Sequence, residues 1–120
     1  MLFRSDVYNY GNMARSFTFI DDIVDGVLAV HAKAPSNKPA IKLLNIGNAE
    51  SVKLTDFIEC LETCLNKKAI CNYLPLQPGD VPETCADVAQ LKQDYGYEPK
   101  VSVDVGVAKF VQWYREFYNL

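Results

Sequence analysis

Apolar residues recur at helical spacing in four stretches of the chain. The four predicted helices span residues 21–33, 51–67, 87–95 and 102–117. Asp21 or Asp22 is expected to cap the first helix, and Asp87 with Gln90 has the form of a capping box for the third. Gly96 follows the third helix as a natural C′ residue.

Four other segments have the composition of short strands. These are residues 6–10, 16–20, 41–46 and 69–74. The first two flank Gly11-Asn12 and are expected to form two strands around a turn, and the third is expected to be buried. The pattern predicts one mixed α/β domain over residues 1–120, with about four helices and four short strands. Such short strands make only a small sheet, so some are expected to join a sheet supplied by other residues.

A turn predicted at Gln77-Pro78-Gly79-Asp80 separates the last strand from the third helix. Pro78 fixes φ near the value of the second position of a type II turn, and Gly79 supplies the positive φ of the third. Asp80 is therefore presented at a defined place. A surface connector is the simpler interpretation of this turn, and a ligand-holding loop is the alternative.

Composition and charge exclude several classes of function. The hydrophobic fraction of 49% and charged fraction of 22% are those of a globular protein, and the net charge of −3 argues against a nucleic-acid surface. No apolar run is long enough for a membrane span and no signal peptide is evident, so we expect a cytoplasmic protein. The four cysteines lack metal-ligand spacing, which predicts reduced thiols and no metal site.

The sequence lacks the residues of a complete catalytic site. Its six glycines never approach a Gly-x-Gly-x-x-Gly or P-loop spacing, so no cofactor-binding residue is predicted. No tyrosine is followed by lysine four positions later, which removes the phenol pair that works beside a nicotinamide. With one histidine and no Gly-x-Ser-x-Gly, a serine or cysteine hydrolase is not expected either.

The remaining polar residues suit an anionic, hydroxyl-rich ligand. Arg15 offers forked charged donors for a phosphate, Asp80 can accept two hydroxyl hydrogen bonds from a ribose, and Tyr8 can face a base. Each has a simpler alternative: a solvated surface arginine, a turn aspartate and a packed tyrosine.

Several motifs in order resemble the C-terminal portion of extended short-chain dehydrogenase/reductase enzymes that act on nucleotide sugars, most closely the bacterial UDP-glucuronate 4-epimerase group. These are DVYNYGNMARSFTFIDDIVDG at 6–26, LNIGN at 44–48, LQPGDVP at 76–82, ADV at 86–88 and GVAKFVQWY at 106–114. The resemblance implies a Rossmann-type parent whose N-terminal part supplies the NAD site and the Tyr-x-x-x-Lys group, both absent here.

The resemblance also implies roles for individual residues. Arg15 is expected to contact the diphosphate of a UDP-sugar, Asp80 to accept ribose hydroxyls, and the strand at Val7-Tyr8 to lie against the uracil. Gln77 stands where many relatives carry arginine, and it can hydrogen-bond a phosphate or sugar without adding charge. No catalytic residue is carried over, and NAD is implied only for the full-length parent.

Three positions depart from the family pattern. Ser16 replaces the usual aspartate after the arginine, Phe19 replaces tyrosine, and Cys85 stands where tyrosine is common. The first two changes remove polar groups near the site, so Arg15 is expected to lose some of its positioning.

The expected function is therefore UDP-sugar binding by a fragment of an NAD-dependent epimerase, without epimerase activity of its own. One alternative is a module that self-associates or binds a partner through exposed strand edges, without a ligand. Another is a parent enzyme that is a nucleotide-sugar dehydratase.

Overall fold

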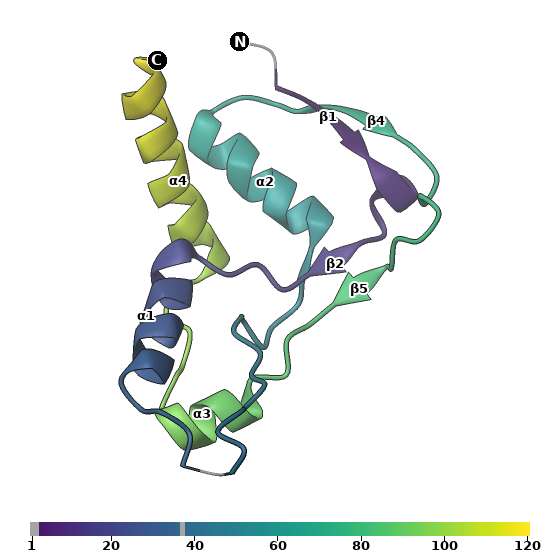
Figure 1. Cartoon of the computed structure of the whole chain (residues 1–120). Coiled ribbons are helices and arrows are strands. Elements are labelled where there is room, and N and C mark those ends of the chain that lie inside the picture. The colour runs from purple at the N-terminus through teal and green to yellow at the C-terminus, as the bar shows by residue number, and fades with distance from the viewer. Residues whose placement is uncertain (1–2, 37) are drawn as a thin grey trace.

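The structure is a computed structural model that describes residues 3–36 and 38–120 (Figure 1). Its α-helices in this part of the chain are α1 (Ile20–His31), α2 (Leu54–Leu65), α3 (Ala89–Tyr95) and α4 (Val103–Tyr118). The strands are β1 (Arg4–Val7), β2 (Ala14–Arg15), β3 (Val52–Lys53), β4 (Ile70–Tyr73) and β5 (Glu83–Thr84). A short 3-10 helix, η1 (Tyr8–Gly11), follows β1. The mixed α/β class is confirmed.

The strands form two small sheets. In one sheet β1 runs parallel to β4, with Val7 opposite Tyr73. In the other, β2 lies between an antiparallel β3 and a parallel β5. Figure 1 shows α2 and α4 packed side by side, with α1 and α3 toward the other end of the molecule. The principal extents are 53 × 37 × 19 Å, so the chain is thin in one direction.

The four predicted helices are present, with some differences at their ends. Helix α2 begins only at Leu54, because the two residues before it form β3. The predicted capping box of Asp87 with Gln90 is wrong, because Val88 is the N-cap residue of α3 and Asp87 Oδ1 accepts the N–H of Ala89 at 3.0 Å instead. Gly96 ends α3 with a φ of 68°, as predicted from its lack of a side chain.

The prediction that Asp21 or Asp22 caps α1 is wrong, because Phe19 is the N-cap residue. Asp22 lies in the first turn, is 3% exposed, and accepts the backbone N–H groups of Lys100 and Val101 at 3.0 Å each. A buried carboxylate needs such partners to offset its loss of hydration. The contact ties α1 to the segment that leads into α4.

The predicted pair of strands around Gly11-Asn12 is wrong. Asn9, Tyr10 and Gly11 have positive φ values of 49°, 53° and 86°, so the chain coils into η1 after β1. Strand β1 pairs with β4 instead, and residues 16–19 have no regular structure. Strand β4 confirms the prediction for residues 69–74.

The prediction of a buried strand at residues 41–46 is also wrong. The segment has no regular structure, and Ile41 and Leu43 are 78% and 91% exposed. Leu44 and Ile46 pack against the hydrophobic core. A strand requires a neighbour for its backbone N–H and C=O groups, and none of the described segments forms a ladder with this one.

The hydrophobic core lies where α3, the end of α1 and residues 44–46 meet. The buried members of this cluster are Val88, Leu91 and Tyr97, and burial raises the pKa of the Tyr97 phenol above its ordinary value. Val7, Met13, Val107 and Val111 are buried outside this cluster. Many apolar side chains on α1 and α4 remain exposed, among them Ile20, Val24, Val27, Leu28, Phe110, Trp113 and Phe117. Among the described residues, none of the helices is long and apolar enough to cross a membrane.

Replacing Gly26 with alanine should destabilise the fold. A Cβ at Gly26 would lie 2.9 Å from Ile46 Cγ2 and from Tyr97 Cε2, inside the core. Alanine favours an α-helix by about 1 kcal/mol over glycine, but overpacking a core costs about 1–3 kcal/mol and should decide the sign. Urea unfolding of Gly26→Ala would measure the loss of stability.

The matched control is Val27→Ala on the same helix, where the side chain is 52% exposed and a change within about 0.5 kcal/mol is expected. A Gly26→Ala protein more stable than the parent chain would contradict the packing described around Tyr97.

Candidate functional site

The turn predicted at residues 77–80 is present. The N–H of Asp80 donates to the carbonyl oxygen of Gln77 at 3.2 Å, and Gly79 has a φ of 85°. These features are those of a type II turn closed by its own backbone hydrogen bond. The position of Asp80 is thereby set by local backbone geometry.

Backbone hydrogen bonds anchor the chain on both sides of this turn. Before it, the Leu74 N–H donates to Val7 O at 2.9 Å, and the Tyr10 N–H donates to Leu74 O at 3.0 Å. After it, the Ala14 N–H donates to Pro82 O at 2.9 Å. The turn therefore projects between β1 with η1 on one side and β2 on the other.

Arg15 lies on β2 and reaches this turn with its side chain. Nη1 donates to Ala14 O at 2.9 Å and to Pro82 O at 3.0 Å. Nη2 donates to Asp80 Oδ1 at 2.9 Å, which is also an ion pair. The structure thus brings together two of the residues selected from the sequence, although 65 positions separate them.

Asp80 is held by its own loop as well as by Arg15. Its Oδ1 accepts the Val81 N–H at 2.8 Å, whereas its Oδ2 has no hydrogen-bond partner among residues 3–36 and 38–120. The Arg15 and Asp80 side chains are 27% and 34% exposed. The pair is partly shielded from water and still accessible to a ligand.

The side chains of the other selected residues make no hydrogen bond to this pair within residues 3–36 and 38–120, although the Gln77 carbonyl group accepts the Asp80 N–H. Val7 is 1% exposed, and its carbonyl group accepts the Leu74 N–H, so its side chain is not accessible to a ligand. Tyr8 is half-buried at the start of η1, and Gln77 is exposed at the first position of the turn. Within the described part of the chain, no hydrogen bond joins any of these three side chains to Arg15 or Asp80.

Ser16, one of the departures from the family pattern, does not contact Arg15. Its Oγ donates to the carbonyl oxygen of Asn48, and Thr18 Oγ1 accepts the Asn48 N–H at 2.9 Å. Cys85 has a comparable role, since its Sγ donates to Ala49 O at 3.0 Å. These contacts join the loop at residues 48–49 to the segments that directly follow β2 and β5.

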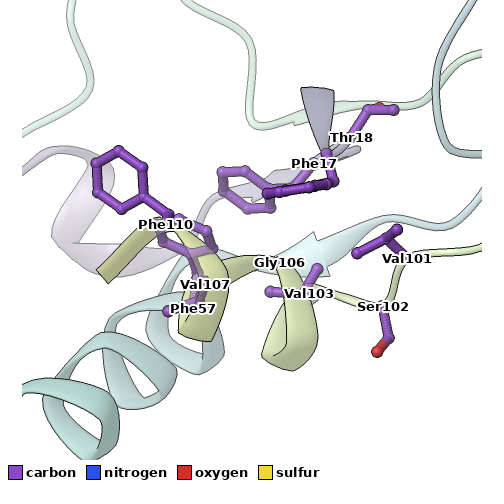
Figure 2. A pocket seen from close by; sticks show the side chains of 10 residues that line it. Phe17, Thr18, Phe57, Val101, Ser102, Val103, Gly106, Val107 and Phe110 are labelled. Carbon is purple, nitrogen blue, oxygen red and sulfur yellow. The ribbon is translucent and has the colours of Figure 1, made fainter. Parts of the chain in front are cut away.

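An apolar pocket of about 190 Å³ lies beside the segment that follows β2. Figure 2 shows its lining, which comes from residues 17–19, α2, residues 101–102 and the first half of α4. Phe17 and Phe57 stack in its wall with ring centroids 4.1 Å apart. Arg15 and Asp80 are not part of this lining, so the polar pair and the apolar pocket are separate features.

The sequence did not reveal the contribution of the Ala14 and Pro82 carbonyl groups. Both accept hydrogen bonds from Arg15, and together they fix the plane of its guanidinium group. Every residue has a carbonyl group, so residue type carries no signal for such a role. Only the pairing of β2 with β5, which is a long-range contact, places Pro82 beside Arg15.

Known proteins resemble this chain over nearly its whole length, although no family model matches it. It is 44% identical to Protein CapI of Staphylococcus aureus, over 95% of this chain and 38% of that protein. It is 36% identical to a probable UDP-glucuronate 4-epimerase of Rhizobium meliloti, over 95% and 38% of the two chains. The structure of the Bacillus cereus UDP-glucuronic acid 4-epimerase in complex with UDP-glucuronic acid and NAD superimposes with a TM-score of 0.83 and 28% identity, over 94% of this chain and 35% of that one.

The fold is therefore that of part of a short-chain dehydrogenase/reductase epimerase. The chain is homologous over most of its length to UDP-glucuronate 4-epimerases and to CapI. It spans a little over a third of the length of these relatives.

Substituting Gly79 should disturb the site through backbone torsion rather than crowding. A Cβ at Gly79 would meet no atom within 4 Å, but the φ of 85° is strained for any residue with a side chain. Gly79→Ala should cost about 1–2 kcal/mol of stability, and Gly79→Asn should cost less because asparagine tolerates positive φ. Urea unfolding of the two variants would measure the difference, and equal stability of both with the parent chain would contradict the turn assignment.

Proposed function

We propose that this chain is the C-terminal, nucleotide-sugar-binding portion of an NAD-dependent epimerase that acts on UDP-glucuronate. In this proposal Arg15 contacts the diphosphate and Asp80 accepts hydrogen bonds from the ribose hydroxyl groups. The observation that carries the proposal is the meeting of these two side chains at an anchored turn. The relatives named above support the choice of a UDP-sugar as the ligand.

The free atoms of the pair match the chemistry of such a ligand. Arg15 keeps donors that no described residue uses, and guanidinium groups bind phosphate oxygens well because they are charged and forked. Asp80 keeps Oδ2, a carboxylate oxygen that can accept hydroxyl hydrogen bonds. A cation and an acceptor side by side are what a diphosphate joined to a ribose requires.

Gln77 and Tyr8 complete the proposed ligand contacts. Gln77 lies at the exposed start of the turn and can donate its amide to a phosphate or sugar without adding charge. The burial of Val7 changes the expectation for the uracil, because only Tyr8 or the backbone of this segment is accessible. We assign the base-facing role to Tyr8.

The residues of this chain do not fit NAD. A dinucleotide is bound by a glycine-rich turn between a strand and the N-terminus of a helix. Here α1, α2 and α4 follow Phe19, Lys53 and Ser102, and the sequence has no Gly-x-Gly-x-x-Gly. We therefore derive no hydride transfer from these residues. Their proposed task is to hold the nucleotide part of the substrate while other groups act on the sugar.

Arg15→Ala should weaken UDP binding about tenfold or more, because a phosphate would lose charge-assisted hydrogen bonds. Titration of UDP to millimolar concentration, followed by backbone amide chemical shifts, would give the affinity. The expected shifts in the parent chain are at Tyr8, Arg15 and Asp80.

Arg4→Ala is the matched control for that titration, since Arg4 is an exposed arginine on β1 that lies opposite Ile70, at the other end of the strand from Val7. It removes the same charge and should leave the affinity for UDP nearly unchanged. An absence of shifts at the three site residues in the parent chain would refute nucleotide binding by this chain.

The chain alone should not convert UDP-glucuronate to its 4-epimer, even with NAD present. The sequence has no tyrosine followed by lysine four positions later, so it lacks the acid–base pair beside the nicotinamide. Incubation of the purified chain with both compounds, followed by separation of the two UDP-sugars, would test this. Turnover that stays with the protein through a second purification would contradict the expectation.

A further inference from the structure

The guanidinium group of Arg15 is held on one side and open on the other. Both hydrogens of Nη1 are used, because this nitrogen donates to Ala14 O at 2.9 Å and to Pro82 O at 3.0 Å. Nη2 uses one hydrogen on Asp80 Oδ1. Of the five N–H donors of an arginine, the Nε–H and one Nη2–H have no partner among the described residues.

Asp80 is a firm support for this arrangement. Its Oδ1 also accepts the N–H of Val81, so the carboxylate is fixed to its own loop as well as to Arg15. The loop in turn is fixed by the hydrogen bond from the Asp80 N–H to Gln77 O. A flexible arginine is thus attached to a carboxylate that the backbone holds in place.

Such attachment matters for an anion that binds the free donors. A long arginine side chain loses much of its rotamer entropy when it is fixed in one conformation. Contacts to Asp80 and to two carbonyl groups fix it before any ligand arrives. Ser16, the next residue along the chain, adds no side-chain contact to this set, because its Oγ donates to Asn48 O.

We infer that Asp80 is a positioning residue for Arg15, acting through Oδ1, in addition to any contact that its Oδ2 makes with a ligand. This inference rests on the proposed function, because it concerns how Arg15 meets the diphosphate. It predicts that Asp80 contributes to the recognition of a phosphate that it does not itself touch.

Comparing two ligands separates this role from the others. UDP carries the diphosphate and uridine does not, so the ratio of their affinities measures the contribution of the phosphate contacts. Asp80→Ala should reduce this ratio about three- to tenfold, which lies in the lower part of the range of couplings between contacting side chains. Loss of a ribose contact alone would weaken the binding of UDP and of uridine by the same factor and leave the ratio unchanged. Loss of the negative charge of Asp80 alone would strengthen the binding of the diphosphate and raise the ratio.

Further variants complete the test. Glu83→Ala removes a nearby exposed carboxylate on β5 that makes no hydrogen bond or ion pair with the Arg15 side chain in the described part of the chain, and it should leave the ratio unchanged or slightly raised. In Arg15→Ala the ratio should be low, and adding Asp80→Ala should lower it no further. A ratio of affinities that stays constant or rises in Asp80→Ala would overturn the inference. So would a double variant in which the ratio falls by the product of the two single-variant factors.

The free protein provides a readout without ligand. Hindered rotation of a held guanidinium group should give separate Nη signals for Arg15 in a ¹H–¹⁵N spectrum, and these should merge in Asp80→Ala. Identical Arg15 signals in the two proteins would overturn the inference whatever the ligand does. A parent chain with separate Nη signals and no UDP binding would instead refute the proposed function.

Discussion

The two-residue strand β2 is the element on which the other contacts depend, because its backbone is hydrogen-bonded on both sides. Ala14 and Arg15 pair with β3 on one edge and with β5 on the other. The carbonyl group of the neighbouring Met13 accepts the N–H of Leu54, where α2 begins. Three segments far apart in the sequence therefore meet at a few peptide groups. Buried backbone groups require such partners, which makes so short a strand a firm junction.

The candidate site is a direct result of this junction. Pairing of β2 with β5 places the carbonyl group of Pro82 against Arg15, and the turn before Pro82 then presents Asp80. The Arg15 and Asp80 side chains remain 27% and 34% exposed to water. Because water screens their charges, the ion pair adds little to stability. Its importance lies in geometry, since it fixes the direction of a cation at the surface.

The sequence predicted those features that depend on neighbouring residues. Helical periodicity located α1 to α4, and Pro78-Gly79 predicted the turn, because both signals are local. Arg15 and Asp80 were selected by chemistry and family resemblance. Their direct contact was beyond sequence reasoning, because it depends on strand pairing over a long range. The same limit explains the error at residues 41–46, whose apolar run lacks a neighbouring strand.

The turn at residues 77–80 is shaped by torsion angles and one backbone hydrogen bond, with open space around Gly79. Arg15 holds the end of this turn through Asp80. A ligand arriving there would meet a loop already in its final shape, and no closing step would precede contact. Association at this point would then be limited by diffusion and orientation, and differences in affinity among related ligands would arise mainly in how slowly each one leaves.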